Sequence, residues 1–269
     1  MTPSTLIRPP AVAGSFYPAD PDVLDDAVRR YLSDAVSDDG PDPVAVVAPH
    51  AGYVYSGPVA GSAYARVEGR RAPVDRVLLL GPSHRVAFRG FAVPESEAFR
   101  TPLGDVRIDH EAAERALTRP LVVRSGQAHA QEHSLEVQLP FLQTILPGVP
   151  VLPIVVGLAD AIEVAELLEG LWSDPATFVV VSSDLSHYLP YESAERVDRR
   201  TAAAVEALDW GALGDNSACG RIPLGGLMEV ARRRVLEART IDLRNSGDTA
   251  GPRDQVVGYG AFAFSPAQA

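Results

Sequence analysis

The chain has 269 residues, of which 46% are hydrophobic and 22% charged, the proportions of an ordinary globular protein. Its net charge of −11 argues against nucleic acid and against an anionic membrane surface as partners. The single cysteine, Cys219, excludes an internal disulfide and favours a reducing compartment. There is no signal-peptide pattern and no run of about 18 apolar residues that could cross a bilayer, so we expect a cytoplasmic protein without a membrane span.

Helices and strands alternate along the chain. An irregular segment rich in proline, glycine and aromatics covers residues 8–21, and Asp20 with Pro21 then makes a favourable cap and first turn for a helix. The apolar spacing predicts helices at 21–35, 58–67, 109–118, 135–142 (interrupted at Pro140), 161–172, 194–208 and 224–238. It predicts buried strands at 44–47, 76–80, 151–156, 178–181 and 255–264, and short strands and loops over 85–109. The alternation, without a linker or repeat, predicts one α/β domain over residues 1–269.

Three of the predicted strands end in a small polar loop that carries a histidine. His50 follows the strand at 44–47, His84 the strand at 76–80, and His187 the strand at 178–181. Any one of them could be a hydrogen-bonded structural histidine. Because ligands gather at the carboxyl ends of strands in open α/β sheets, three such positions predict one convergent site. Neutral imidazole is the commonest metal ligand in proteins, so a metal is the expected occupant.

The remaining histidines give weaker signals. His133 lies in a Glu-His-Ser loop, and we expect His110 and His129 to be exposed. Cys219 precedes the predicted helix at 224–238, and a helix N-terminus favours the thiolate, which suits a metal ligand or a nucleophile. The alternative for Cys219 is a small buried hydrophobe.

Two other residues near the strand ends have alternative roles. Asp184 could orient a histidine or cap the turn that follows it. Tyr53 could line a pocket or simply pack. The glycine-rich dinucleotide motif, the P-loop, the Gly-x-Ser-x-Gly elbow and a Cys-x-x-Cys pair are all absent from the sequence, which disfavours nucleotide binding and an α/β-hydrolase triad.

Six motifs in order resemble the Memo family, whose prokaryotic members are called AmmeMemoRadiSam system protein B. The motifs lie at residues 10–18, 48–57, 80–84, 132–136, 182–187 and 219–223. The resemblance covers residues 8–264. It implies a single Memo-like domain with a fold similar to the LigB-type class III extradiol dioxygenases, in which helices cover both faces of a central mixed sheet.

The resemblance also implies roles for particular residues. His50, His84 and Cys219 correspond to the metal-ligand positions of the family. His187, with Asp184 beside it, corresponds to a position that looks like the acid–base residue of the dioxygenases. We further expect the pocket to be lined by Glu132, His133, Tyr53 and Arg221.

The expected ligand set departs from that of the dioxygenases, which use two histidines and a carboxylate. A thiolate in the third place is softer and accepts Cu(I) or Zn(II) as well as Fe(II), and O₂ can oxidise it. We therefore expect Fe(II), with Cu or Zn as alternatives. Dioxygenase chemistry cannot be inherited from the fold alone.

Three functions remain open on the sequence. The first is a metal-binding protein that handles iron or copper, or that serves the radical SAM and AMMECR-type partners implied by the family name. The second is a non-haem iron oxidoreductase of extradiol type acting on a small phenolic substrate, with His187 as general base. The third is a metal-free enzyme whose nucleophile is Cys219, paired with His187 or His50.

Overall fold

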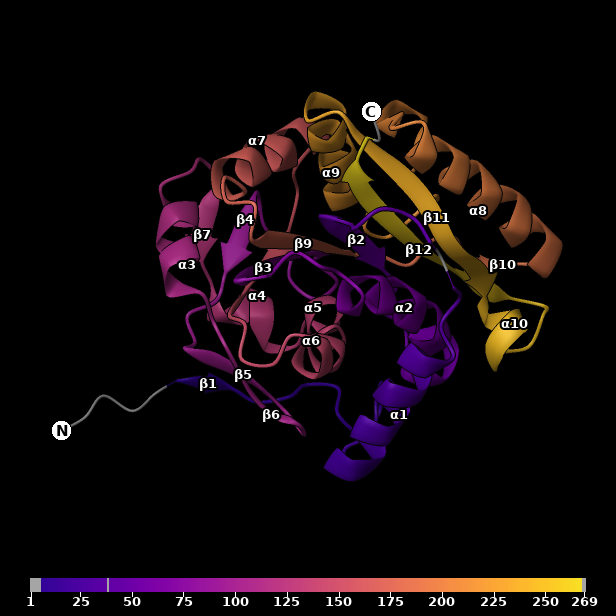
Figure 1. Cartoon of the computed structure of the whole chain (residues 1–269), viewed down its shortest axis with the longest axis horizontal. Coiled ribbons are helices and arrows are strands. Elements are labelled where there is room, and N and C mark those ends of the chain that lie inside the picture. Colours follow the sequence, from indigo (N-terminus) through magenta and orange to yellow (C-terminus); the bar gives the residue numbers. More distant parts are fainter. Residues whose placement is uncertain (1–5, 38, 268–269) are drawn as a thin grey trace.

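The computed structural model describes residues 6–37 and 39–267 and shows a mixed sheet with helices on both faces (Figure 1). This confirms the predicted α/β class. The strands of the large sheet are β2 (Ala45–Ala48), β3 (Arg76–Pro82), β4 (Phe91–Val93), β7 (Val122–Arg124), β8 (Val151–Val156), β9 (Thr177–Ser182), β10 (His187–Leu189), β11 (Leu236–Asn245) and β12 (Val256–Pro266). A smaller sheet contains β1 (Ile7–Arg8), β5 (Ala98–Thr101) and β6 (Gly104–Arg107).

Short and long helices connect these strands. They are α1 (Pro21–Ser33), α2 (Tyr53–Glu68), α3 (His110–Leu117), α4 (Gly126–Ala130), α5 (His133–Glu136), α6 (Leu139–Ile145), α7 (Ala161–Leu171), α8 (Tyr191–Glu206), α9 (Arg221–Arg233) and α10 (Ser246–Thr249), with a 3-10 turn at Trp210–Ala212. No helix within residues 6–37 and 39–267 has the length and apolar character needed to cross a membrane.

The centre of the large sheet is parallel. Its strand order is β10-β12-β2-β9-β3-β8-β4-β7, with β11 beside β12. β2, β9, β3 and β8 run in the same direction, and Ala48 at the end of β2 lies opposite Ser182 at the end of β9. The carboxyl ends of β2, β9 and β3 therefore meet at one edge of the sheet, where the loops carrying His50, Asp184 and His84 begin.

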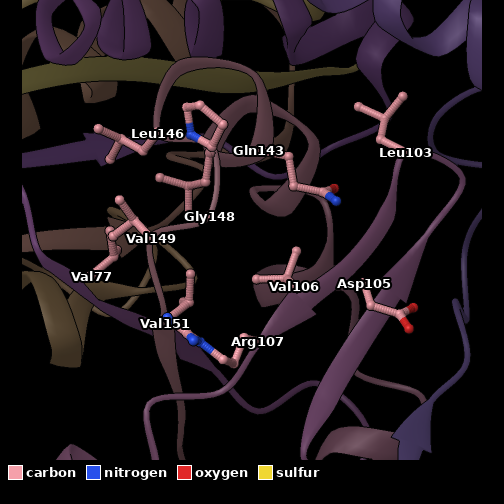
Figure 2. Close-up of a pocket in the computed structure, with 12 residues that line it drawn as sticks. Val77, Leu103, Asp105, Val106, Arg107, Gln143, Leu146, Gly148, Val149 and Val151 are labelled. Atoms are coloured by element: carbon pink, nitrogen blue, oxygen red, sulfur yellow. The ribbon is translucent and has the colours of Figure 1, made fainter.

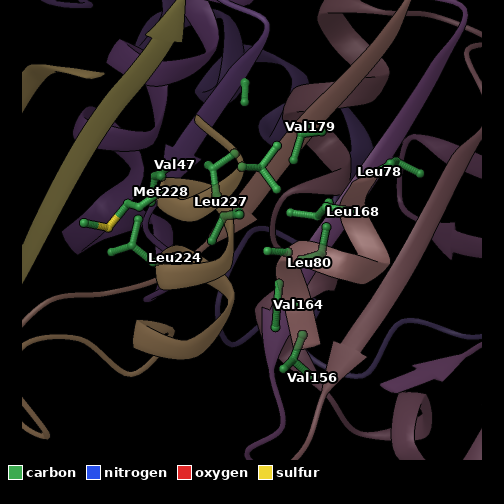
Figure 3. Close-up of a cluster of buried hydrophobic side chains, with 14 of the residues drawn as sticks. Val47, Leu78, Leu80, Val156, Val164, Leu168, Val179, Leu224, Leu227 and Met228 are labelled. Atoms are coloured by element: carbon green, nitrogen blue, oxygen red, sulfur yellow. The ribbon is translucent and has the colours of Figure 1, made fainter. Parts of the chain in front are cut away.

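Side chains alternate along the central strands between two apolar layers. On one face, Val47, Leu80 and Val179 pack against Val164 of α7 and Leu227 of α9 (Figure 3). The intervening residues pack on the other face against α1, α2 and α6. Each fully buried leucine or valine contributes about 1.5–3 kcal/mol, so both layers hold the sheet rigid beneath the loops at its edge.

The predicted caps and interruptions are present. The Asp20 carboxylate accepts the backbone N–H groups of Asp22 and Val23 at 3.1 Å and starts α1. Asp109 caps α3 in the same way. Pro140 lies in the first turn of α6, so the predicted break separates α5 from α6.

The prediction was wrong where a strand follows α9. The helix predicted to continue to residue 238 ends at Arg233, and β11 begins at Leu236. Val235 between them has a φ of +55°, a left-handed conformation that stops the helix. β11 then pairs antiparallel with β12 along its whole length. α2 also begins at Tyr53, earlier than the predicted start at Pro58, which lies inside the helix.

One buried carboxylate ties the segment before α1 to α5. The Glu136 side chain is 0% exposed and accepts a hydrogen bond from Arg8 Nη1 at 2.7 Å and from the Tyr17 hydroxyl at 2.6 Å. It also accepts the backbone N–H of Ala11 at 2.8 Å and that of Val12 at 3.0 Å. The irregular segment is therefore fixed by polar contacts, and it braces the short helix that begins at His133.

Candidate metal centre

Three imidazoles converge at the edge where the parallel strands end. His50 follows β2, His84 follows β3, and His133 is the first residue of α5. The nitrogen atoms they can offer to a metal all lie within 4.8 Å of one another. Their ring centroids are 5.2 Å apart for His50 and His84, 5.6 Å for His50 and His133, and 4.7 Å for His84 and His133. This separation makes the cluster a candidate site for one ion.

Glu132 fixes the orientation of the most exposed of these rings. One of its oxygens lies 2.9 Å from His84 Nδ1, and the other accepts the backbone N–H of His84 at 2.6 Å. Burial would raise the pKa of Glu132, but the hydrogen bonds from His84 and Ser134 lower that pKa to about 2. An ionised carboxylate can only accept, so His84 Nδ1 carries a hydrogen, and in the neutral ring the lone pair is then on Nε2.

His50 is the most buried ligand candidate, with 2% of its surface exposed. Its Nδ1 lies 2.9 Å from Ser182 Oγ, and its Nε2 lies 3.2 Å from Cys219 Sγ. Burial, followed by repulsion from His84, lowers the pKa of His50 to about 3. The imidazole is therefore neutral near pH 7, the form that binds metals.

Of the predicted acid–base pair, Asp184 contacts His50 and His187 does not belong to the cluster. Asp184 is buried, and its Oδ1 accepts the backbone N–H of His50 at 2.7 Å while Oδ2 lies 4.0 Å from His50 Nε2. Asp184 therefore orients a histidine, but through the backbone of His50. His187 lies outside the three-imidazole cluster, on β10, with an exposed ring whose Nδ1 is 2.8 Å from the Leu185 carbonyl. Its acid–base role stays a prediction.

The partly buried Cys219 lies against the cluster. Its Sγ is 3.2 Å from His50 Nε2 and 3.6 Å from the Asp184 carbonyl oxygen. The absence of a side chain at Gly220 allows the loop that carries Cys219 to lie this close, because a Cβ at position 220 would clash with Ser183 Cβ at 2.6 Å. Burial, followed by the charge of Asp184, raises the pKa of Cys219 to about 12. The neutral thiol is therefore favoured, opposite to the thiolate expected from the helix terminus, because these effects outweigh the backbone N–H of Gly220.

His133 contributes the third imidazole, although the sequence placed it only in the pocket. Its ring packs on Phe16, with centroids 4.8 Å apart. Its Nδ1 is buried without a hydrogen-bond partner among the described residues, and lies 3.5 Å from Glu132 Oε1. Burial, followed by repulsion from His50 and His84, lowers the pKa of His133 to about 4. A buried imidazole nitrogen without a hydrogen-bond partner is a feature that a bound metal ion would satisfy.

The other predicted pocket residues contact different groups. Tyr53 is buried and donates its hydroxyl hydrogen to the Val137 carbonyl at 2.7 Å, and it lines a different cavity from the one beside His84. Arg221 pairs with Asp215 at 2.8 Å. A cavity of about 420 Å³ adjoins His84 and Cys219, and its walls also include Val86, Phe88, Leu158 and Ile222.

The two remaining histidines are both less exposed than expected. His110 is half-buried, with 42% of its side chain exposed, and pairs with Glu97 at 2.6 Å. His129 is 2% exposed, and its Nε2 lies 3.0 Å from the Ala92 carbonyl oxygen. The expectation was wrong because α4 packs this ring edge-on against Phe99, with centroids 5.6 Å apart.

A second pocket, shown in Figure 2, lacks the groups that bind transition metals. It has a volume of about 260 Å³ and lies between β6 and the loop after α6. No histidine or cysteine occurs among its described lining residues. The Asp105 carboxylate already accepts a hydrogen bond from Arg100 at 2.7 Å. The imidazole cluster is therefore the better candidate.

The fold and the cluster together define an α/β protein with a candidate metal centre at the edge of its sheet. The profile of the family described as Memo-like protein matches residues 8–263. The chain belongs to this family, as the six motifs predicted.

Relatives cover nearly the whole chain. It is 38% identical over 280 residues to a MEMO1 family protein of Methanopyrus kandleri, covering 96% of this chain and 98% of the relative. It is 37% identical over 271 residues to a MEMO1 family protein of Aquifex aeolicus, covering 96% and 99%. A solved structure of an uncharacterized protein from Escherichia coli K12 has a TM-score of 0.53 and 14% identity over 80% of this chain and 98% of that one, a similarity of fold alone.

Proposed function

We propose that the protein binds a transition-metal ion through His50, His84 and Cys219, with His133 as a further nitrogen donor. The observation that carries the proposal is the cluster of three imidazoles, whose nitrogen atoms lie within 4.8 Å of one another. In two of them Nδ1 contacts a polar side chain, Ser182 for His50 and Glu132 for His84, so that Nε2 is the nitrogen left for a metal. Metal-binding histidines usually donate their second ring N–H to a carboxylate, carbonyl or water. Glu132 does this for His84, and Ser182 Oγ lies 2.9 Å from His50 Nδ1.

The sulfur position supports including Cys219. Donor atoms that share a tetrahedral ion, with bonds of about 2.0 Å to nitrogen and 2.3 Å to sulfur, lie roughly 3.5 Å apart. The separation of 3.2 Å between Cys219 Sγ and His50 Nε2 is close to that value. A mixed nitrogen and sulfur set suits Fe(II), our first choice, and also Cu(I) and Zn(II). A metal there would supply Lewis acidity or, for iron and copper, redox chemistry.

A second candidate is an oxidoreductase of extradiol type. The cavity of about 420 Å³ beside His84 and Cys219 favours it, because it offers room for a small phenolic molecule next to the proposed ion. His187 at the edge of the site would then act as general base. The third candidate, a metal-free Cys–His pair, is supported by the contact of Cys219 with His50 but opposed by the raised pKa of Cys219. Radical SAM and AMMECR-type partners stay predictions.

Metal analysis tests the proposal. Untagged protein is equilibrated anaerobically with Fe(II), Cu(I) or Zn(II), desalted and analysed by inductively coupled plasma mass spectrometry. We expect about one ion per chain in the wild type, and strong loss in His84→Ala and Cys219→Ala. His110→Ala is the matched control, because its half-buried ring lies outside the cluster. A wild-type protein that retains none of the three metals would refute the proposal. Oxygen uptake by the iron-loaded protein with a series of catechols separates the enzyme from the binding protein.

A further inference from the structure

A chain of buried hydrogen bonds lies behind His50, on the side away from Cys219. It passes through Ser182, the last residue of β9, to Gln138, which precedes α6, and on to Tyr64 of α2. All three side chains are fully buried. None of them was given a role from the sequence, although Ser182 opens the motif at 182–187, and none is a proposed metal ligand.

The hydroxyl of Ser182 has a single possible arrangement. Its Oγ lies 2.6 Å from the Ser134 carbonyl oxygen, and two oxygens this close require a hydrogen between them. A carbonyl cannot donate, so the hydroxyl hydrogen of Ser182 is used there. The two lone pairs of Ser182 Oγ then face Gln138 Nε2 at 2.8 Å and His50 Nδ1 at 2.9 Å. Ser182 can therefore only accept from His50.

The amide of Gln138 is fixed by its other partners. Its Nε2 donates to the Pro49 carbonyl at 2.9 Å, which requires the nitrogen on that side. Its Oε1 accepts the Tyr64 hydroxyl at 2.9 Å. The amide cannot turn over without placing its oxygen against a carbonyl and its NH₂ against a hydroxyl that donates. Gln138 thus presents a hydrogen to Ser182 and prevents the serine hydroxyl from rotating toward His50.

We propose that Ser182 and Gln138 are positioning residues that hold His50 in the tautomer with hydrogen on Nδ1. In a neutral imidazole the other nitrogen then carries the lone pair, so Nε2 is an acceptor directed at Cys219 Sγ and at the proposed ion. The inference rests on the proposed function only for its effect on metal binding. The tautomer itself is a property of the chain.

The two orienting groups differ in charge. Glu132 presents a carboxylate to His84, whereas Ser182 presents a neutral hydroxyl to His50. A carboxylate partner raises the basicity of a histidine ligand more than a neutral partner does. The cluster therefore contains one strongly and one weakly donating imidazole, with the weaker one beside the sulfur.

Nitrogen NMR of protein labelled with ¹⁵N-histidine tests the tautomer directly. In the metal-free wild type we expect His50 to show a protonated Nδ1 and an unprotonated Nε2. Ser182→Ala removes the acceptor of the His50 hydrogen, and Gln138→Leu removes the donor that fixes the Ser182 hydroxyl. In both variants we expect a mixture of the two His50 tautomers and Zn²⁺ binding weaker by about 10–100-fold. Ser182→Thr, which keeps the hydroxyl, should restore the wild-type pattern.

Gln143→Leu is the matched control, since the side chain of this partly exposed glutamine of α6 hydrogen-bonds to the β5–β6 hairpin and not to the cluster residues that the structure describes. It should leave both readouts unchanged. A wild-type His50 with hydrogen on Nε2 would overturn the inference, as would wild-type Zn²⁺ affinity together with an unchanged tautomer in folded Ser182→Ala. If Ser182→Ala does not fold, the tautomer is still decided by the spectrum of the wild type and by that of Tyr64→Phe, which removes the hydroxyl that fixes the Gln138 amide and should add the second tautomer. A wild type that retains none of Fe(II), Cu(I) and Zn(II) would refute the proposed function, while its spectrum would separately support or refute the tautomer.

Discussion

The pH dependence of Zn²⁺ affinity shows whether Cys219 or His133 is the third ligand beside His50 and His84. If Cys219 is the third ligand, binding must release its thiol proton, because the pKa of Cys219 is raised to about 12. If His133 is the third ligand, no proton is released from it near pH 7, because burial lowers its pKa to about 4. The pKa of His50 is about 3, so this ring is neutral in either case.

The size of the effect follows from one proton. Well below the pKa of a ligand, each pH unit changes affinity by about tenfold, or 1.4 kcal/mol, and affinity rises with pH. Between about pH 6 and pH 8 the thiol should therefore add about a 100-fold gain that Cys219→Ala lacks. Competition with a chromophoric chelator at several pH values gives the two slopes, and His110→Ala serves as the control. Parallel slopes in the wild type and Cys219→Ala would refute the thiolate as a ligand.

Three further predictions concern residues around the site. Glu136→Gln should lower the free energy of unfolding in urea by about 3–5 kcal/mol, because it leaves buried Arg8 without its anion; a loss below about 1 kcal/mol would contradict the reasoning. His129 has a pKa lowered by burial to about 3, below its ordinary value, so it contributes stability at neutral pH that is lost as pH falls from about 6.5 toward 3. The difference in unfolding free energy between about pH 7 and pH 5 should then be about 2 kcal/mol smaller in His129→Phe than in the wild type, and equal differences would exclude the effect. Gly220→Ala puts a methyl group 2.6 Å from Ser183 Cβ, so it should displace the neighbouring thiol and weaken Zn²⁺ binding by about tenfold, and a folded variant with unchanged affinity would disprove this.

The parts of the fold that could be predicted are those specified by local patterns. β2, β3 and β9 are continuous apolar runs, and a strand covered on both faces needs no other signal. His50 and His84 could be brought together from sequence because strand ends in a parallel sheet meet at one edge. The six ordered motifs identified the family.

His133 could not be assigned to the cluster because its position depends on contacts between distant elements. It begins α5, and nothing in its local sequence says which strand α5 packs on. α5 fits against β3 because Gly81 has no side chain, and a Cβ there would lie 2.8 Å from Ser134 Oγ. The end of α9 was missed for a different reason. Val235 adopts a left-handed conformation that the sequence signals only when glycine or asparagine is present.

The Glu136 contacts and the sulfur–imidazole contact have a consequence for how the chain folds. Arg8 and Glu136 are 128 positions apart, and Cys219 and His50 are 169 apart. Contacts between such distant positions form late, since the entropy of closing long loops must be overcome first. We expect an incompletely folded chain to contain every proposed ligand yet to lack the assembled cluster. Capture of a metal by the complete set of ligands would then mark the completion of folding.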